Sequence, residues 1–529
     1  MTQASITPTK LETQQNLIAA MMEPDFYPKP PSTLTHRETD ISHLFFADDL
    51  VYKIKKAVRH SFLDFSTPSK RRHFLNEELR LNRRLAPSVY LAVMPIARNP
   101  SGWGLSSEGE AVEYALVMRR LPEKRMLAFL LDTHQVTSEM MHDLAELIAS
   151  FHIGAAPARR MEPGRHLDVL EKLWSENIAD LQPFVGDLID PDLYRIIDRF
   201  GTDFLHSHRA LLTRRAEQGW IRDIHGDLHC EHICFAPEGI QIFDCIEFSS
   251  QLRCGDLASE VSFLLMDLEV RGGEAMAKPF LSRYCELLDD PELPLLLPFY
   301  ECYRALLRGR RNATRSQGRD TSAARYFRHA ARITWQPFQP FLLLLCGLTG
   351  SGKTTLAAEL SQRLDLPVFS SDVIRKGLTG RPGRENAATS VGIYRQPVTE
   401  KTYGKIVREA EKQILAGRGA ILDATFARRV NREKVNRMAA SHNVPVFLIH
   451  CFATEATIRD RLAQRAAQGL DLSDGRWELY VEQRARCEPP SEIPVQNYLE
   501  LNTVQPVTEL AAVCERFIRS RLDPREVQP

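Results

Sequence analysis

One glycine-rich segment restricts the possible folds of this chain more than any other. Residues 347–354, GLTGSGKT, match the pattern G-x-x-x-x-G-K-[ST] at every position. An apolar stretch that is typical of a buried strand, 341–346, precedes the segment, and TTLAAELSQRL at 354–364 has a helical pattern. The motif needs this order, because its backbone N–H groups must surround a phosphate at the N-terminus of a helix. The segment therefore predicts a nucleotide-binding α/β domain.

Each polar residue of this loop has an expected part in holding a nucleotide. The glycines allow the backbone to wrap the phosphates, Lys353 would reach the β- and γ-phosphates, and Thr354 would hold Mg²⁺. The nucleotide-binding residues expected here are Gly347, Gly350, Ser351, Gly352, Lys353, Thr354 and Thr355.

The chain changes character near residue 338. Pro337 and Pro340 interrupt the preceding helical pattern, and from there apolar strands alternate with helical stretches. The strands are LLLLC, PVFSS, GAILDAT and PVFLIHCF, and a helical segment follows each of them. Such alternation indicates a parallel sheet covered by helices. We predict an α/β P-loop domain over residues 338–525.

This half, about 340–520, resembles the small P-loop kinases of AAA-type ATP-binding fold, in the group that includes gluconate kinase, polynucleotide 5′-kinase and the zeta-type toxins. The resemblance rests on the P-loop, on SSD at 370–372 with Arg375 after it, on ILDAT at 421–425, and on IRDRLAQR at 458–465.

The resemblance to P-loop kinases implies roles for single residues. Asp372 would receive the acceptor hydroxyl, Arg375 would bind the acceptor, and Asp423 would support the metal or the acceptor. Arg461 and Arg465, which lie four apart on one helical face, would belong to a lid over the transferred phosphoryl group. The alternatives are a helix N-cap for Asp372 and a solvated helix face for the two arginines.

A second segment, IRDIHGDLHCEHICF at 221–235, allows two interpretations. Its histidines and cysteines could bind zinc. A structural zinc site usually takes four ligands from two separated pairs, however, and no second cluster with matching spacing follows. A catalytic loop that contains HGDLH at 225–229 is the favoured interpretation, and Cys230 and Cys234 are then small buried residues.

The N-terminal half, about 40–310, resembles the aminoglycoside phosphotransferases and their choline-kinase-like relatives. VYK at 51–53, Glu78, HGDLH at 225–229 and IFDCIE at 242–247 occur in the order of that family. The resemblance implies a bilobal, protein-kinase-like α+β domain over residues 36–335, after a lead-in segment at 1–35.

The same resemblance implies how this domain would work. Lys53 would hold the ATP phosphates and pair with Glu78, Asp227 would orient or deprotonate the acceptor hydroxyl, and Asp244 would bind Mg²⁺. Lys55 lies on the same strand face as Lys53, so it is an alternative for the phosphate lysine.

One position departs from the family pattern. Where the family pattern has a loop asparagine that binds a second Mg²⁺, this chain has His232. A neutral imidazole is a poorer ligand for a hard cation than an amide oxygen. Metal binding is therefore altered, or His232 contacts phosphate, or this domain has weak activity.

The overall composition limits the partners. The chain of 529 residues has 68 basic and 68 acidic side chains, so its net charge gives no general attraction to nucleic acid or acidic membranes. We interpret the arginine-rich stretch 304–332 as a solvated helical face, with phosphate or nucleic-acid contact as the minority alternative. No apolar run approaches a membrane span, and the first residues lack a secretory pattern. Ten cysteines without a CxxC pair suggest reduced thiols in the cytoplasm.

The sequence thus predicts a phosphotransferase with two kinase-like domains, which use ATP and Mg²⁺ and act on small hydroxylated acceptors. One alternative is a single active P-loop kinase that an N-terminal pseudokinase regulates, and His232 motivates it. The other is a nucleic-acid 5′-end kinase, which the neutral charge disfavours without excluding it.

Overall fold

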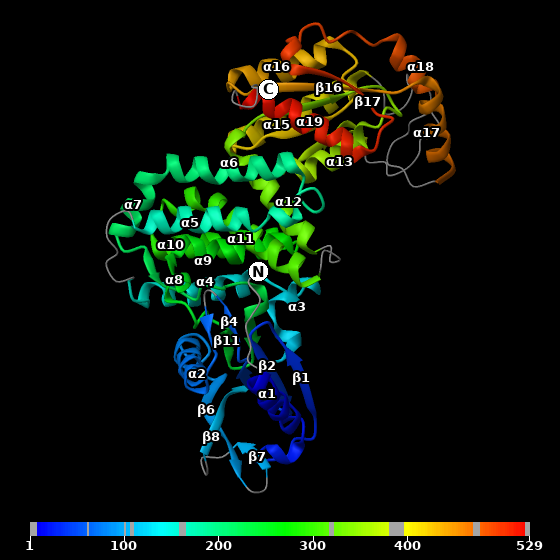
Figure 1. Cartoon of the computed structure of the whole chain (residues 1–529). Coiled ribbons are helices and arrows are strands. Elements are labelled where there is room, and N and C mark those ends of the chain that lie inside the picture. The colour runs from blue at the N-terminus through cyan, green and yellow to red at the C-terminus, as the bar shows by residue number, and fades with distance from the viewer. Residues whose placement is uncertain are drawn as a thin grey trace. The chain divides into compact units, whose positions relative to one another are not determined.

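The structure is a computed structural model that describes residues 8–60, 63–99, 102–105, 110–157, 165–316, 322–379, 396–468 and 477–523. The chain forms two compact units, Met1–Ala330 (unit 1) and Ala331–Pro529 (unit 2) (Figure 1). None of the helices in these described ranges is both long enough and apolar enough to cross a membrane.

Unit 1 begins with an antiparallel sheet in the strand order β1-β2-β3-β8-β6-β7. β2 and β3 form a hairpin: they pair from Ser42–Lys55 to Ala47–Leu50, and Asp48 turns the chain with a φ of 49°. The strands of this sheet are β1 (Leu34–Glu38), β2 (Ser42–Ala47), β3 (Leu50–Lys55), β6 (Tyr90–Asn99), β7 (Gly102–Leu105) and β8 (Glu110–Arg119). The short strands β4 (Arg59–His60) and β5 (Leu63–Asp64) pair separately.

Helices cover both faces of this sheet (Figure 1). On one face, α1 (Pro8–Met21) buries Leu17 and Met21, so much of the expected lead-in segment belongs to the hydrophobic core. On the other face, α2 (Pro68–Asn82) buries Leu75. Thr67 begins α2 as its N-cap, where its hydroxyl accepts a hydrogen bond from the Lys70 N–H.

The remainder of unit 1 is helical, with two small strand pairs that support the 221–235 segment. The central helix is α9 (Leu257–Val270), in which every residue from 257 to 268 is buried. Strand β9 (Ile221–Asp223) pairs with β12 (Cys254–Asp256), and β10 (Ile233–Ala236) pairs with β11 (Gly239–Ile242). The other helices are α3 (Leu127–Asp132), α4 (Ser138–Gly154), α5 (Arg165–Ala179), α6 (Pro191–Ser207), α7 (Arg209–Glu217), α8 (Ser250–Arg253), α10 (Glu274–Leu288), α11 (Leu293–Ser316) and α12 (Ser322–Ile333).

Unit 2 has a five-stranded sheet in the order β14-β15-β13-β16-β17, and all its pairings are parallel, as predicted. The strands are β13 (Leu342–Cys346), β14 (Val368–Ser370), β15 (Ala420–Asp423), β16 (Val446–Phe452) and β17 (Tyr498–Asn502). The helices are α13 (Lys353–Leu364), α14 (Ser371–Thr379), α15 (Gln396–Leu415), α16 (Arg429–Ser441), α17 (Glu455–Gln468), α18 (Trp477–Ala485) and α19 (Val507–Leu522).

Strand β13 is buried on both faces because helices cover both sides of the sheet. Leu343 and Leu345 pack with α13 and α19, whereas Leu342 and Leu344 pack with α15 and α16, as the period-two alternation of a strand requires. Trp335 also packs in the first of these cores, under the guanidinium of Arg519 at 4.0 Å, so the segment before residue 338 already belongs to unit 2.

A buried ion cluster links α7 to the region around α9 and α10 in unit 1. Arg215 has no solvent-exposed side-chain surface, and it donates to Asp256 and Asp290 at 2.8 Å each. Replacing the arginine would leave two buried carboxylates without their counterion.

We therefore expect Arg215→Leu to lower the free energy of unfolding by about 3–5 kcal/mol, measured by urea denaturation. Arg209→Leu is the matched control on the same helix, because Arg209 pairs with Glu171 at 3.0 Å in an exposed position. The control should change stability by about 1 kcal/mol or less. Equal losses in the two variants would contradict the prediction.

Candidate active sites

The loop that follows β9 in unit 1 is held by two carboxylates of α9. Glu260 accepts hydrogen bonds from the backbone N–H groups of His225, at 2.7 Å, and Gly226, at 2.6 Å. Seven residues further along α9, Asp267 accepts from the Cys230 N–H at 3.0 Å. Both carboxylates are buried, so the loop is fixed to the most buried helix of the unit.

His225 ties this loop to the segment that follows β11. Its Nε2 donates to the Phe243 carbonyl at 3.0 Å, and its Nδ1 accepts from the Asp227 N–H at 3.3 Å. Burial lowers the pKa of His225 to about 4, so the ring is neutral near pH 7. The loop and the segment that carries Asp244 are thereby held side by side.

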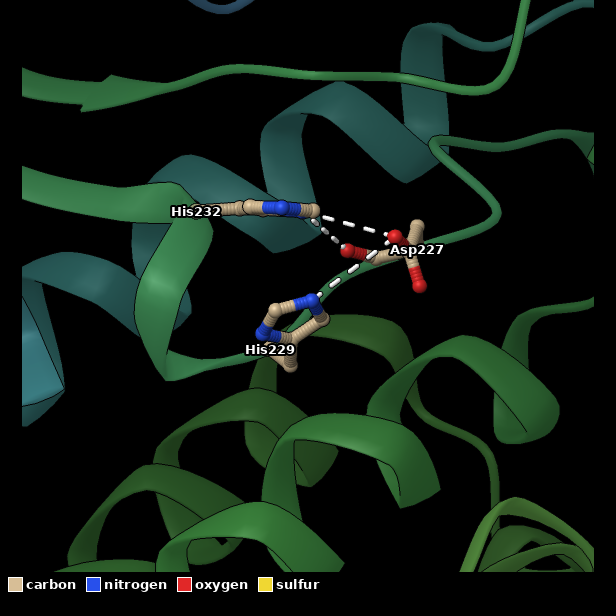
Figure 2. Close-up of side chains that lie close together, drawn as sticks. All are labelled: Asp227, His229 and His232. Carbon is tan, nitrogen blue, oxygen red and sulfur yellow. Dashed lines mark hydrogen bonds and ion pairs between the residues drawn. The ribbon is translucent and has the colours of Figure 1, made fainter. Parts of the chain in front are cut away.

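Asp227 lies at the tip of the loop among cationic and imidazole groups. Its Oδ2 is 3.7 Å from His229 Nε2, 3.7 Å from His232 Nδ1 and 4.0 Å from Arg311 Nη1. Figure 2 shows both imidazole rings directed at Asp227. Burial favours a protonated Asp227, but the three neighbours outweigh it and hold its pKa well below the usual range. Asp227 is therefore an ionised acceptor, as an orienting group or base for a hydroxyl must be.

The structure distinguishes the two candidate lysines of β3. Lys53 Nζ lies 2.7 Å from Glu78 Oε1 on α2 and 3.0 Å from Asp244 Oδ1. Lys55 Nζ is fully buried between Glu78, at 2.8 Å, and Glu247, at 2.5 Å. Lys53 therefore reaches the side chain expected to bind metal, whereas Lys55 supports Glu78 from inside the core.

His232 lies between the two aspartates of the site. Its Nδ1 is 2.9 Å from the backbone carbonyl oxygen of Asp227, and its Nε2 is 3.6 Å from Asp244 Oδ2. Asp244 itself has a positive φ of 63°, and its N–H donates to the Tyr90 hydroxyl at 3.1 Å. Lys53 and His232 lower the pKa of Asp244 in spite of its burial. The loop with Asp227, the segment with Asp244 and the Lys53 side chain therefore meet at one site.

In unit 2, the glycines of the 347–354 loop occupy conformations that other residues rarely adopt. Gly347 has a φ of 145°, and a Cβ there would lie 2.3 Å from the Cys451 carbonyl oxygen. Gly350 and Gly352 have φ values of 77° and 86°, and Gly352 is the N-cap of α13. The backbone therefore requires glycine at these points.

Lys353 and Thr354, at the start of α13, meet the carboxyl end of β15. Thr354 Oγ1 donates to Asp423 Oδ2 at 3.0 Å, while Lys353 Nζ donates to the Leu348 carbonyl at 2.9 Å. Burial raises the pKa of Asp423, against the opposing effects of Lys353 and Thr354. A hydroxyl and a carboxylate side by side at the loop are the oxygen donors that Mg²⁺ prefers.

A cavity of about 180 Å³ opens beside this loop. Asp372, in the first turn of α14, faces the cavity and accepts from Arg375 Nη1 at 3.0 Å. Arg465 lines the cavity, but Arg461 instead donates to Thr503 Oγ1 at 3.0 Å. The predicted site residues on the cavity wall are Gly350, Gly352, Lys353, Thr354, Asp372, Arg375, Asp423 and Arg465; Gly347, Ser351, Thr355 and Arg461 are not on it.

Two family models match the chain, one in each unit. The phosphotransferase enzyme family matches residues 46–296, and a model described as an AAA domain matches residues 342–490. An uncharacterized protein of Mycobacterium tuberculosis (strain H37Rv) is 30% identical over 446 residues, which cover 83% of this chain and 87% of that protein. The chain belongs to one family with this protein, and its first domain is a phosphotransferase-family domain. Its second domain is a P-loop kinase domain.

Two further proteins are similar to parts of this phosphotransferase. Gluconokinase of Gluconobacter oxydans is 25% identical over 163 residues, which cover 30% of this chain and 82% of that enzyme. The crystal structure of choline kinase from Cryptosporidium parvum is 12% identical, covers 60% of this chain and 94% of that chain, and has a TM-score of 0.38.

The arginines of α11 are site residues that the sequence interpretation missed. Arg304 Nη1 donates to the Gly226 carbonyl at 3.1 Å, and Arg308 Nη2 donates to Glu231 at 3.0 Å. Both are buried, so the solvated-face interpretation of 304–332 is wrong for them. Arg304, Arg308 and Arg311 are spaced at i, i+4 and i+7, which places them on one helical face toward the loop. This spacing in the sequence could have identified the three arginines as residues that face the loop.

The cysteines of the loop do not support the zinc interpretation. Cys230 and Cys234 are both fully buried, and burial raises the pKa of the Cys234 thiol to about 11. Zinc binds the thiolate form, which these surroundings disfavour. In the described part of unit 1, the loop's potential metal donors are instead Asp227, His229 and His232.

The buried histidines make the stability of the phosphotransferase domain depend on pH. Burial lowers the pKa of both His225 and His229 to about 4, below the ordinary value near 6.5. The unfolded chain therefore binds more protons than the folded one between these values, so stability is lost as the pH falls. We expect a loss of up to roughly 3 kcal/mol per histidine between about pH 6.5 and pH 4.

Calorimetric unfolding at a series of pH values would measure this slope. His225→Gln should flatten it, because glutamine does not titrate. His142→Gln, at an exposed position, should leave it unchanged. An identical pH profile for wild type and His225→Gln would contradict the assignment of a buried neutral His225.

Proposed function

We propose that each unit transfers the γ-phosphoryl group of ATP to a hydroxyl of a small acceptor, with Mg²⁺ or a related divalent cation. One recurring arrangement supports this proposal. Each site combines a lysine for the phosphates, a carboxylate for the metal, and a second carboxylate for the acceptor hydroxyl. Phosphoryl transfer depends mainly on such positioning and charge stabilisation.

In unit 1, Asp227 would accept the hydrogen bond, and then the proton, of the acceptor hydroxyl. Lys53 would neutralise charge on the phosphates, and Glu78 would hold the lysine in place through its 2.7 Å contact. A divalent cation at Asp244 would supply further stabilisation of the phosphate charge. Arg304 keeps the loop backbone in position through the Gly226 carbonyl.

In unit 2, the wrapped loop and the N-terminus of α13 would hold the nucleotide phosphates, with Lys353 released from the Leu348 carbonyl to reach them. Thr354 and Asp423 would hold the metal, because they already lie 3.0 Å apart through their oxygen atoms. Asp372 would receive the acceptor hydroxyl, and Arg465 would stabilise the transferred group. Arg461 would act indirectly, because it holds Thr503.

The lining of the unit 2 cavity favours an anionic acceptor. Five basic side chains border it, against three carboxylates. The basic residues are Lys353, Arg375, Arg428, Arg465 and Arg486, and the acidic ones are Asp372, Asp423 and Glu482. Arginine is suited to paired hydrogen bonds with carboxylates as well as phosphates. Together with the similarity to a gluconokinase, this lining supports a hydroxylated acid of the sugar-acid type as the acceptor.

The state of the cysteines supports a reducing compartment. All ten are free, and seven of them are buried. We therefore place the enzyme in the cytoplasm, where thiols remain reduced.

Asp227→Asn and Lys353→Ala should remove two separable ATP-consuming activities, each by about a hundredfold or more. The measurement is ADP release from full-length protein with a library of hydroxylated metabolites, sugar acids included. Asp187→Asn and Lys401→Ala, both at exposed positions, are the matched controls and should retain full activity.

The pattern of losses distinguishes the alternatives. If Asp227→Asn leaves every turnover intact while Lys353→Ala abolishes it, unit 1 is a pseudokinase. If Lys353→Ala leaves all turnover intact, the assignment of unit 2 is wrong.

A further inference from the structure

We propose that the unit 1 site binds a first-row transition-metal dication, of the Mn²⁺ or Co²⁺ kind, between His232 Nε2 and Asp244 Oδ2, in preference to Mg²⁺. The proposal rests on the proposed function of unit 1 and specifies its metal. It follows from the position where the family pattern has asparagine and this chain has His232.

The hydrogen bonding of His232 determines which ring nitrogen can bind a metal. The Asp227 carbonyl oxygen, 2.9 Å from Nδ1, can only accept a hydrogen bond, so Nδ1 carries the hydrogen and donates it. In the neutral ring, Nε2 then has a free lone pair. A backbone carbonyl that fixes the ring in this way is the usual support of a metal-binding histidine.

That lone pair faces a second acceptor. Nε2 is 3.6 Å from Asp244 Oδ2, which is beyond hydrogen-bond distance. The other carboxylate oxygen, Oδ1, is already bound by Lys53 at 3.0 Å, so Oδ2 is the oxygen left for a ligand. When the ring is neutral, two acceptors face each other across this gap, and a cation between them would be bound by both.

The gap has the size that a transition metal needs. Metal–nitrogen and metal–oxygen bonds of about 2.1 Å would span it with an angle of roughly 120° at the ion. Asp227, His229 and His232 form a further group of potential donors, whose atoms lie within 4.8 Å of one another. The His232 side chain is 14% exposed, which leaves the remaining coordination positions accessible to water or phosphate.

The chemistry of the donors sets the preference. Mg²⁺ requires oxygen ligands and loses its water reluctantly, whereas imidazole suits the first-row transition metals. An asparagine at position 232 would offer an amide oxygen and restore a set of oxygen donors. His232 therefore selects against Mg²⁺ at this site while keeping the geometry for a cation.

The test uses full-length protein carrying Asp423→Asn, which removes the oxygen-donor site of unit 2. Isothermal titration with Mn²⁺ and with Mg²⁺ should show at least tenfold tighter binding of Mn²⁺ than of Mg²⁺. His232→Asn should lower the Mn²⁺ affinity tenfold or more and bring the two ions close together. His142→Asn, at an exposed position, is the control and should bind as the parent does.

Electron spin echo spectroscopy of the Mn²⁺ complex gives a second measure that needs no variant. A nitrogen coupling from imidazole is expected in the parent protein and should be absent in His232→Asn. Equal affinities for Mn²⁺ and Mg²⁺, or no nitrogen coupling in the parent, would overturn the proposal. Mn²⁺ binding with the nitrogen coupling, but without phosphoryl transfer by unit 1 to any acceptor, would instead overturn the proposed function and leave the metal site standing.

Discussion

The loop of unit 1 that carries Asp227 depends on the carboxylate of Glu260. This side chain is buried in α9, and it accepts from two consecutive backbone N–H groups of the loop and faces His152 Nε2 at 3.2 Å. Burial disfavours its charge, but these partners lower its pKa and keep it ionised. Because an unpaired buried carboxylate is costly, the loop has one favourable position relative to the helix. The placement of Asp227 and of His232 follows from that position.

Unit 2 also holds a carboxylate beside its loop, but other contacts fix the position of that carboxylate. There the loop is short and glycine-rich, and its position follows from parallel pairing, since Leu345 of β13 lies beside Asp423 of β15. Thr354 comes to Asp423 because the helix starts directly after the loop. In unit 1, by contrast, Asp227 lies on a loop and Asp244 on the segment after a strand. The His225 side chain and a backbone hydrogen bond from the Phe243 N–H to the His232 carbonyl, at 3.0 Å, hold the two together. The glycine-rich loop of unit 2 and the start of α13 are contiguous in sequence, whereas the unit 1 site also draws on Lys53 of β3, 191 positions before Asp244.

This difference explains what the sequence could predict. The glycine loop of unit 2 follows from one contiguous motif, and its parallel sheet follows from the alternation of apolar strands and helices along the chain. In unit 1, Lys53 and Lys55 have the same strand periodicity, and only the placement of Asp244 and Glu247 separates their roles. Asp267 and the arginines of α11 were missed because charged residues are usually exposed, and their burial depends on loop carbonyls and N–H groups far away in the chain.

The proposed metal sites of the two units also differ in their donor atoms. Thr354 and Asp423 offer oxygen atoms alone, which suits Mg²⁺. His232 and Asp244 offer a nitrogen and an oxygen, and the ring cannot turn to hide its nitrogen without breaking its bond to the Asp227 carbonyl. That carbonyl belongs to the residue expected to act as the base, so His232 contacts both the expected base and the expected metal ligand. With the proposed roles, residue 232 would act on metal selection and on base positioning together.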